Sequence, residues 1–428
     1  MLCLSHLCEI MRFKELTKMN LEKNILDRFL RYTAVDTMSD PDALASQHPS
    51  TDGQWDLLRM LEKELRQLGI EDVLLDSNGV VSANMKANKE GLPSIAFMAH
   101  VDTASDCNGN HVKARIVNDY DGEDIKLSSK LTLDVKSNPE LSKYKGETVI
   151  VTDGTSLLGA DDKAGVAEIM AAVETLVSDP SIKHGPVQIF FTSDEETGCG
   201  MDYFPMDRFS SEACYTADGG VRYVVETECF NAATVDVHFT GVSAHLGSAK
   251  NRMVNAVTMA SHFISAIPQA QSPEATDGRD GYWCPYSIEG SAADVKVKLF
   301  LRDFDYDKLL DRIEALRSLA QTVGKLFAGG VVAFKSKVSY RNMNEACLKN
   351  PKATELLFKA GEQLGMPLRT ELIRGGTDGA RLAEKGIPCP NLFTGGDNYH
   401  SLKEWAALPA MADGARLIVQ IIRCWAQD

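Results

Sequence analysis

Short apolar runs that end in acidic or histidine residues constrain this sequence more than any other feature. Four runs, at residues 95–99, 187–192, 213–217 and 391–394, have the length of buried β-strands, and Ser156-Leu-Leu is a shorter fifth. Candidate ligands follow them within a few residues: His100, Asp102, Glu195, Glu196, Asp218, His400 and Asp161. Side chains at the carboxyl ends of parallel strands meet at one edge of an open α/β sheet. Two histidines with several carboxylates at that edge predict a dinuclear metal site and favour a metallohydrolase.

Composition limits the class of protein. At 428 residues the chain is too long for one small core, so we expect two domains. The net charge of −15 argues against a nucleic-acid-binding surface, and no apolar run approaches the roughly 18 residues of a membrane-spanning helix. Ten cysteines, scattered without a Cys-x-x-Cys pair, favour reduced thiols and a cytoplasmic location. Residues 1–19 are expected to be an extension without fixed structure.

The pattern along the chain predicts an α/β domain interrupted by a second domain. Strands alternate with helices up to about residue 222, and residues 107–150 form a long insertion that we interpret as a β-rich flap. The segment 234–338 follows the order β-α-β-β-α-β of a ferredoxin-like sandwich. We therefore predict a mixed sheet with helices on both faces, built from residues 20–228 and 342–428. An inserted lid domain is expected at 229–341.

Each motif has an ordinary alternative when it stands alone. Those alternatives are a helix N-cap for Asp161-Asp162, a solvated acidic turn for Glu195-Glu196, turn chemistry for Asp218, a chance pair for His100 and Asp102, and a surface side chain for His400. The combination is more specific, because carboxylates that converge without a cation repel one another. Carboxylate and imidazole ligands without thiolates suit zinc, with manganese or cobalt as substitutes.

Two further considerations support this interpretation. If His100 is a ligand, Asp102 can accept a hydrogen bond from its other ring nitrogen and fix the orientation of the imidazole. Competing motifs fail, since the sequence has neither a phosphate-binding loop nor a dinucleotide fingerprint. Gly241-Val-Ser-Ala-His misses the nucleophile elbow because its fifth residue is His245.

From about residue 20 to its end, the chain resembles the peptidase T family of tripeptide aminopeptidases. That family belongs to the dinuclear-zinc exopeptidase clan, which also holds aminoacylases and carboxypeptidases. The matching motifs are His100-Val-Asp-Thr, Thr152-Asp-Gly, Leu158-Gly-Ala-Asp-Asp-Lys-Ala-Gly, Asp194-Glu-Glu, Asp218-Gly-Gly, Met253-Val-Asn-Ala, Arg302-Asp-Phe-Asp, Arg374-Gly-Gly-Thr-Asp-Gly-Ala and Pro390-Asn-Leu-Phe-Thr-Gly-Gly. The insertion at 107–150 and the Arg374 motif resemble peptidase T more than its deacylase relatives.

The resemblance implies a role for each candidate residue and a zinc exopeptidase-like fold. One zinc would be held by His100, Asp161 and Asp218, the other by Asp161, Glu196 and His400, with Asp161 bridging and the Asp161-Asp162 peptide cis. Glu195 would be the general base, Asp102 would support His100, and His245 would stabilise an oxyanion. Arg302 and Arg374 would clamp a peptide carboxylate, with a structural salt bridge as the alternative for each.

The implied activity is release of the N-terminal residue from short peptides, tripeptides first, by a metal-bridged water that Glu195 activates. Short peptides would be the partners, and the lid domain would pair two subunits. A dipeptidase or an N-acyl amino acid deacylase of the same clan would share the ligands. A catalytically silent binding or scaffold homologue, or a metal-independent α/β binding protein, is the alternative from another class.

The sequence also departs from the family pattern near two of these residues. After His400 it continues Ser401-Leu402-Lys-Glu where the family has Gly-Lys-His-Glu, and Asp397 replaces an aromatic residue or histidine. Leu246 stands in the lid motif where proline is common. The ligands are all present, so these departures bear on substrate length preference and rate.

Overall fold

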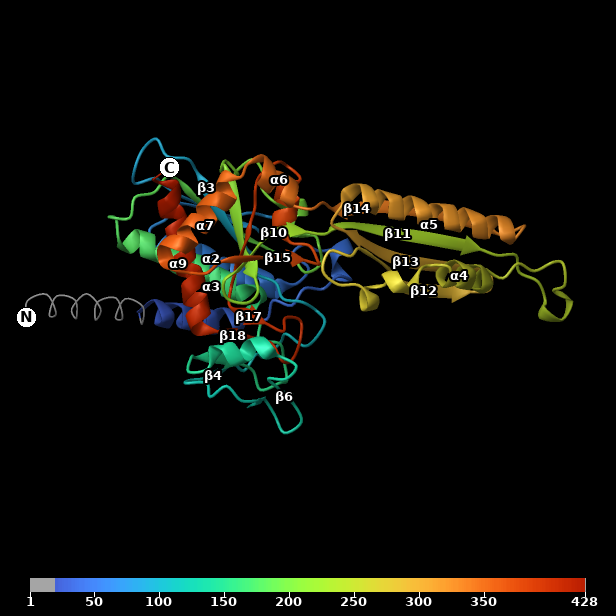
Figure 1. Ribbon diagram of the computed structural model, residues 1–428, viewed down its shortest axis with the longest axis horizontal. Helices are drawn as coiled ribbons and strands as arrows, with labels where there is room; N and C mark the ends of the chain where they lie inside the picture. Colours follow the sequence, from blue (N-terminus) through green and yellow to red (C-terminus); the bar gives the residue numbers. More distant parts are fainter. Residues whose placement is uncertain (1–19, 428) are drawn as a thin grey trace, which may run out of the picture. The chain divides into compact units, whose positions relative to one another are not determined.

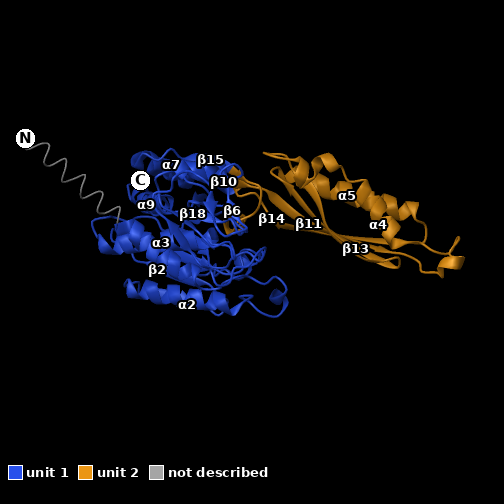
Figure 2. Ribbon diagram, turned by 90° about the horizontal axis from the view of Figure 1, so that it is seen from below, with its two compact units in different colours: residues 1–227, 346–371, 386–428 blue, residues 228–345, 372–385 orange. Residues whose placement is uncertain are grey.

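The computed structural model describes residues 20–427 (Figure 1). These residues form two compact units (Figure 2). Unit 1 comprises residues 20–227, 346–371 and 386–427, and unit 2 comprises Glu228–Glu345 with Leu372–Lys385. The extension expected at 1–19 lies outside the described residues. Within 20–427, no helix combines the length and the apolar character needed to cross a membrane.

Unit 1 is built on an eight-stranded sheet in the order β1-β2-β8-β3-β9-β16-β10-β15. Its strands are β1 (Asp72–Leu75), β2 (Val81–Met85), β3 (Ile95–His100), β8 (Val187–Thr192), β9 (Ala213–Gly219), β10 (Val224–Cys229), β15 (Arg369–Ile373) and β16 (Asn391–Phe393). The four central strands β8, β3, β9 and β16 are parallel, whereas β1, β2 and β10 pair antiparallel. Every residue of β3 and β8 is buried, which explains their continuous apolar runs.

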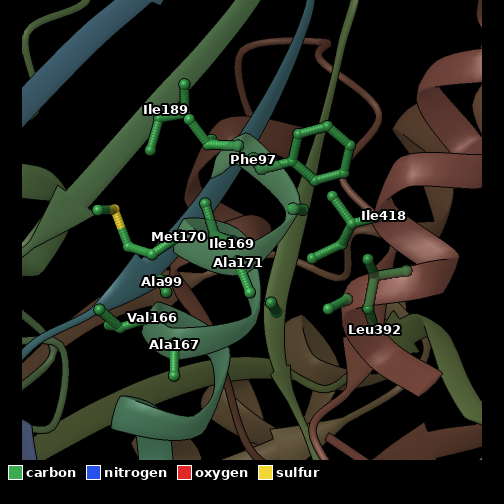
Figure 3. Packing of buried hydrophobic residues seen from close by; sticks show 14 of the residues in the cluster. Phe97, Ala99, Val166, Ala167, Ile169, Met170, Ala171, Ile189, Leu392 and Ile418 are labelled. Carbon is green, nitrogen blue, oxygen red and sulfur yellow. The ribbon is translucent and has the colours of Figure 1, made fainter. Parts of the chain in front are cut away.

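Helices pack on this sheet around one large core (Figure 3). They are a helix at 20–33, α2 (Asp52–Gln67), α3 (Ala160–Ser178), α7 (Lys352–Leu364) and α9 (Leu408–Trp425). The helix α3 is buried on most of its surface, and its apolar side chains contact both the sheet and α9. Gly165 permits the close approach of α3 to β9, because a Cβ there would lie 1.7 Å from the Ala217 carbonyl oxygen. The expected mixed α/β fold is confirmed.

The insertion at 107–150 contributes strands and a second, smaller core. Its elements are β4 (Arg115–Val117), β5 (Ile125–Lys126), β6 (Thr132–Leu133), the 3₁₀ helix η2 (Pro139–Tyr144) and β7 (Val149–Val151). The strands β4 and β7 share a sheet with β17 (Gly396–Asp397) and β18 (Trp405–Ala407), which flank His400 in the sequence. Buried apolar side chains of the insertion surround Trp405. The insertion therefore supports the segment that carries His400.

Unit 2 is the expected ferredoxin-like sandwich. The strands β11 (Asn231–Thr240), β12 (Tyr282–Ser291), β13 (Asp294–Asp303) and β14 (Val331–Tyr340) form an antiparallel sheet in the order β12-β13-β11-β14. The helices α4 (Ala256–Ser265) and α5 (Tyr306–Leu326) pack on it through a separate apolar core. The short helix α6 (Asn344–Lys349) begins at the end of the first segment of unit 2. The short helix α8 (Asp378–Ala383) lies within its second segment, Leu372–Lys385.

The Glu168 carboxyl of α3 is fully buried and receives no hydrogen bond from the described residues. It lies against Gly414 of α9, where an added Cβ would be 2.1 Å from Glu168 Oε2. Burial, and then the negative charge of Asp413, raises the pKa of Glu168 well above its ordinary value. At pH values between its ordinary pKa and this raised pKa, Glu168 is therefore protonated in the folded protein and ionised in the unfolded chain.

We expect Glu168→Gln to raise the melting temperature of the metal-free protein at pH 8 by about 5 °C. Because the pKa of Glu168 is raised, its contribution to the free energy of unfolding is fully present below the ordinary carboxyl pKa. That contribution is lost as the pH rises, at about 1.4 kcal/mol per pH unit. Glutamine is neutral at every pH, so the gap in melting temperature between the variant and wild type should narrow at pH 5. Scanning calorimetry in chelator at both pH values measures the gap.

A control on the same helix should behave in the opposite way. Glu174 is bound by Asn24 and Arg28, and these hydrogen bonds lower its pKa despite partial burial. Glu174→Gln should therefore lower the melting temperature at pH 8. A Glu168→Gln gap of the same size at pH 5 and pH 8 would contradict the assignment.

Candidate metal centre

Strands of the central sheet deliver most of the candidate ligands to one edge. His100 is the last residue of β3, Asp218 lies near the end of β9, and Glu195-Glu196 occupy a turn directly after β8. His400 follows β16 and lies between β17 and β18. These strands are parallel, so their carboxyl ends share one edge, as the sequence predicted.

Asp161 lies between the two histidines. Its Oδ1 is 3.0 Å from His100 Nε2, and its Oδ2 is 3.3 Å from His400 Nε2. His100 Nε2 is also 3.4 Å from Asp218 Oδ1, and His400 Nε2 is 3.1 Å from Glu196 Oε1. Two ligand sets therefore meet at one carboxylate, with each oxygen of Asp161 facing a different imidazole.

The segment before Asp161 differs from the sequence prediction. Ser156-Leu-Leu was expected to be a strand, but residues 154–159 form a loop. Its apolar side chains are buried, which explains the wrong prediction, and its backbone N–H groups bond to side chains and loops rather than to a neighbouring strand. The Asp161-Asp162 peptide at the start of α3 is cis, as expected.

Asp102 makes more contacts than the sequence suggested. Its carboxylate is fully buried, with Oδ1 3.4 Å from His100 Nδ1. The two oxygens also accept the backbone N–H groups of Glu195 and Glu196, each at 3.1 Å. The Asp102 backbone carbonyl, 3.1 Å from His100 Nδ1, orients the imidazole together with this carboxylate, and the carboxylate also fixes the turn that carries the adjacent glutamates.

Two aspartates near the centre were missed. Asp106 Oδ2 is 3.1 Å from His400 Nδ1, so the second imidazole also has a carboxylate on its outer nitrogen. Asp162 is buried; its Oδ2 accepts the His100 backbone N–H at 3.2 Å, and its Oδ1 has no hydrogen-bond partner among the described residues. The only signal in the sequence was position, because Asp106 follows Asp102 closely and Asp162 comes directly after Asp161.

The Asp194 carboxylate anchors the glutamate turn from the other side. It is fully buried and accepts hydrogen bonds from Ser50 N at 2.7 Å and from Gln54 Nε2 at 2.8 Å, with His48 Nδ1 3.0 Å away. Asp194 also has a φ of 57°, a conformation that few non-glycine residues adopt. These contacts hold the backbone immediately before Glu195 in one conformation.

Burial and neighbouring charges determine the protonation of the cluster. Burial, and then the charge of Asp161, raises the pKa of Glu196 to about 7. Hydrogen bonds to Asp161 and Glu196 raise the pKa of His400 to about 11, against the effect of burial. Burial also disfavours protonation of His100, but hydrogen bonds to three aspartates outweigh it and raise its pKa. The clustered carboxylates thus stabilise positive charge at the site, which protons or divalent cations can supply.

The donor set fits two divalent cations. Among the described residues, two groups place their potential ligand atoms within 4.8 Å of one another: His100, Asp162 and Asp218, and His100, Asp161 and Glu196. Asp162 already accepts the backbone N–H of His100, whereas Asp161 has one oxygen directed to each histidine. Nitrogen and oxygen donors in this number suit zinc, manganese or cobalt.

The remaining candidates lie in unit 2. His245 is exposed and caps a short turn by accepting the Gly247 N–H at 3.2 Å. Arg302 stacks on Phe300 and Tyr340. Arg374 is more fully engaged, because its Nη1 donates to the carbonyls of residues 278 and 280, and its Nη2 to both oxygens of residue 276. A substrate carboxylate at Arg374 would have to replace these contacts.

Comparisons with known proteins find similarity to peptidases. The model of the peptidase family M20/M25/M40 matches residues 148–423. Peptidase T of Clostridium perfringens is 41% identical over 406 residues, which are 95% of this chain and 100% of that protein. Peptidase T of Geobacillus thermodenitrificans is 40% identical over 410 residues, 95% and 99% of the two chains.

Solved structures share the fold. Aminopeptidase PepT from Bacillus cereus superposes with a TM-score of 0.75 at 24% identity, over 95% of this chain and 99% of that one. A dinuclear metal binding peptidase of the M20 family from Bacillus subtilis superposes with a TM-score of 0.64 at 13% identity, over 95% and 98%.

Proposed function

Because this chain belongs to the peptidase family M20/M25/M40, and to peptidase T within it, we propose that it is a metallo-aminopeptidase that removes the N-terminal residue from tripeptides. The observation that carries the proposal is Asp161, whose two oxygens face the two histidines. A carboxylate shared in this way is suited to a dinuclear centre, and a dinuclear centre is suited to hydrolysis of a peptide bond.

We assign the ligands as two sets that share Asp161. His100 and Asp218 complete one set, and Glu196 and His400 complete the other. Two divalent cations held there, for which we propose zinc, would polarise the scissile carbonyl and lower the pKa of a water molecule. Asp102 and Asp106 would keep the two imidazoles oriented through their outer nitrogens.

Glu195 is the proposed general base. It takes a proton from the attacking water and passes it to the leaving amine, so that the N-terminal amino acid and a shortened peptide separate. Asp102 and Asp194 hold the turn that presents Glu195, which limits the motion of the base between these two transfers.

Unit 2 supplies the proposed contacts to substrate. His245 would donate a hydrogen bond to the oxyanion that forms at the carbonyl. Arg302 would bind the peptide carboxylate, and Arg374 would join it by exchanging its bonds to the 276–280 loop for the carboxylate, which would explain a preference for short peptides. We further propose that unit 2 pairs two subunits and that the enzyme acts in the cytoplasm, as the scattered cysteines favour.

A substrate panel tests the proposed function. Metal-reconstituted protein would be incubated with unblocked di-, tri- and tetrapeptides and with their N-acetylated counterparts, and release of free amine would be followed. Fastest cleavage of unblocked tripeptides supports the proposal. Cleavage of only the acylated compounds would identify a deacylase, a preference for dipeptides a dipeptidase, and no turnover with two cations bound a silent homologue.

A further inference from the structure

The Glu404 carboxylate binds the backbone that leads into Asp161. It is buried, and its Oε2 accepts the N–H groups of Leu158 and Gly159 at 2.6 and 2.8 Å. Its Oε1 accepts those of Ala160 and Asp161 at 2.7 and 3.1 Å. A single side chain therefore satisfies four consecutive N–H groups from a position more than 240 residues away in the sequence.

These bonds replace a cap that α3 lacks. The N-cap residue Gly159 has a left-handed φ of 77° and no side chain that could accept a hydrogen bond. Asp161 itself is non-helical, with φ −84° and ψ 105°, so regular helix geometry does not fix its position. The Glu404 carboxylate is the group that holds this stretch of backbone in place.

Glu404 is also part of the segment that carries His400. Its N–H donates to the Ser401 carbonyl at 3.2 Å, and the Ser401 hydroxyl donates to the Asn398 carbonyl at 2.8 Å. The next residue, Trp405, is fully buried in the core formed with the insertion. The same side chain thus connects the loop of one candidate ligand to the segment of another.

We propose that Glu404 is a positioning residue that sets the separation of Asp161 and His400 and thereby the affinity of their shared site for a divalent cation. This inference rests on the proposed metal centre and adds to it a residue that touches neither cation nor substrate. Without the carboxylate, the Asp161 loop and the His400 segment would each keep their own fold, but the distance between Asp161 and His400 would no longer be fixed.

Metal binding by variants tests the inference without requiring catalysis. Zn²⁺ would be titrated into metal-free protein against a competing chelator, and the visible spectrum of the Co²⁺ form would report ligand geometry. In Glu404→Gln, one oxygen and one NH₂ group face four donors, so we expect the affinity for Zn²⁺ of the site that Asp161 and His400 share to fall about 10–100-fold, with an altered Co²⁺ spectrum. Glu404→Asp keeps the charge but is shorter, and should fall between Gln and wild type.

Glu168→Gln is the matched control, since it makes the same substitution at another buried glutamate of unit 1, on α3, whose carboxyl makes no hydrogen bond to the 158–161 loop. It should leave Zn²⁺ affinity and the Co²⁺ spectrum unchanged. If Glu404→Gln, or Glu404→Asp should the Gln variant not fold, binds two Zn²⁺ as tightly as wild type with the same spectrum, Glu404 is only a helix cap and the inference fails. Wild-type protein that binds two cations but cleaves no peptide would overturn the proposed function alone.

Discussion

Glu195→Gln is expected to lower kcat/KM for an unblocked tripeptide by about 10²–10⁴-fold. Glutamine has nearly the same shape as glutamate but cannot accept a proton from water at neutral pH, so the substitution removes proton transfer. Glu195 belongs to neither proposed ligand set, and its backbone N–H bond to Asp102 remains. Metal content, measured on the same samples, should therefore equal that of wild type.

Glu196→Gln provides the comparison, because the adjacent side chain lies 3.1 Å from His400 and is a proposed ligand. That variant should lose metal affinity together with activity, whereas Glu195→Gln should lose activity alone. A Glu195→Gln enzyme that keeps more than a tenth of wild-type kcat/KM would show that another group takes the proton.

The second large effect is expected at Asp161. Asp161→Asn leaves at most one oxygen to serve both ligand sets, so we expect Zn²⁺ affinity to fall by more than the roughly 100-fold typical of outer-shell changes. Peptide cleavage should disappear at stoichiometric metal. Competitive chelator titration followed by metal analysis of the folded protein measures the effect.

Asp162→Asn is its matched control on the neighbouring residue. Asp162 also lies beside His100, but it is fully buried and accepts the His100 backbone N–H, a role that the asparagine oxygen can keep. We expect this variant to retain two cations with a smaller loss of affinity. If Asp162→Asn loses metal and Asp161→Asn does not, the bridging ligand has been assigned to the wrong aspartate.

Much of the site could be predicted because local sequence determines where strands end. The apolar runs before His100, Glu195 and Asp218 are buried on both faces of a parallel sheet, and such strands leave a recognisable signature. The polar residues that follow must then lie at one edge. The alternation of helical and strand patterns along the sequence also predicted the ferredoxin-like order of unit 2.

Other features depend on contacts between distant segments, which no local pattern reports. Ser156-Leu-Leu has the composition of a strand, yet its N–H groups bond to Glu404 and to Asn108. Asp106 and Glu404 are ordinary acidic residues in sequence, and only the fold brings them to His400 and to the Asp161 loop. The hydrogen bonds that Arg374 donates to the 276–280 loop likewise could not be predicted, because the two segments are far apart in the sequence.

The most direct test uses one tripeptide of three different residues, such as Ala-Leu-Gly, with protein stripped of metal and then given increasing Zn²⁺. Products would be identified by mass spectrometry at each step. The account predicts free alanine and Leu-Gly, with a rate that rises until two equivalents of metal are bound per chain and vanishes in Glu195→Gln. Release of free glycine, or equal cleavage by the metal-free protein, would contradict it.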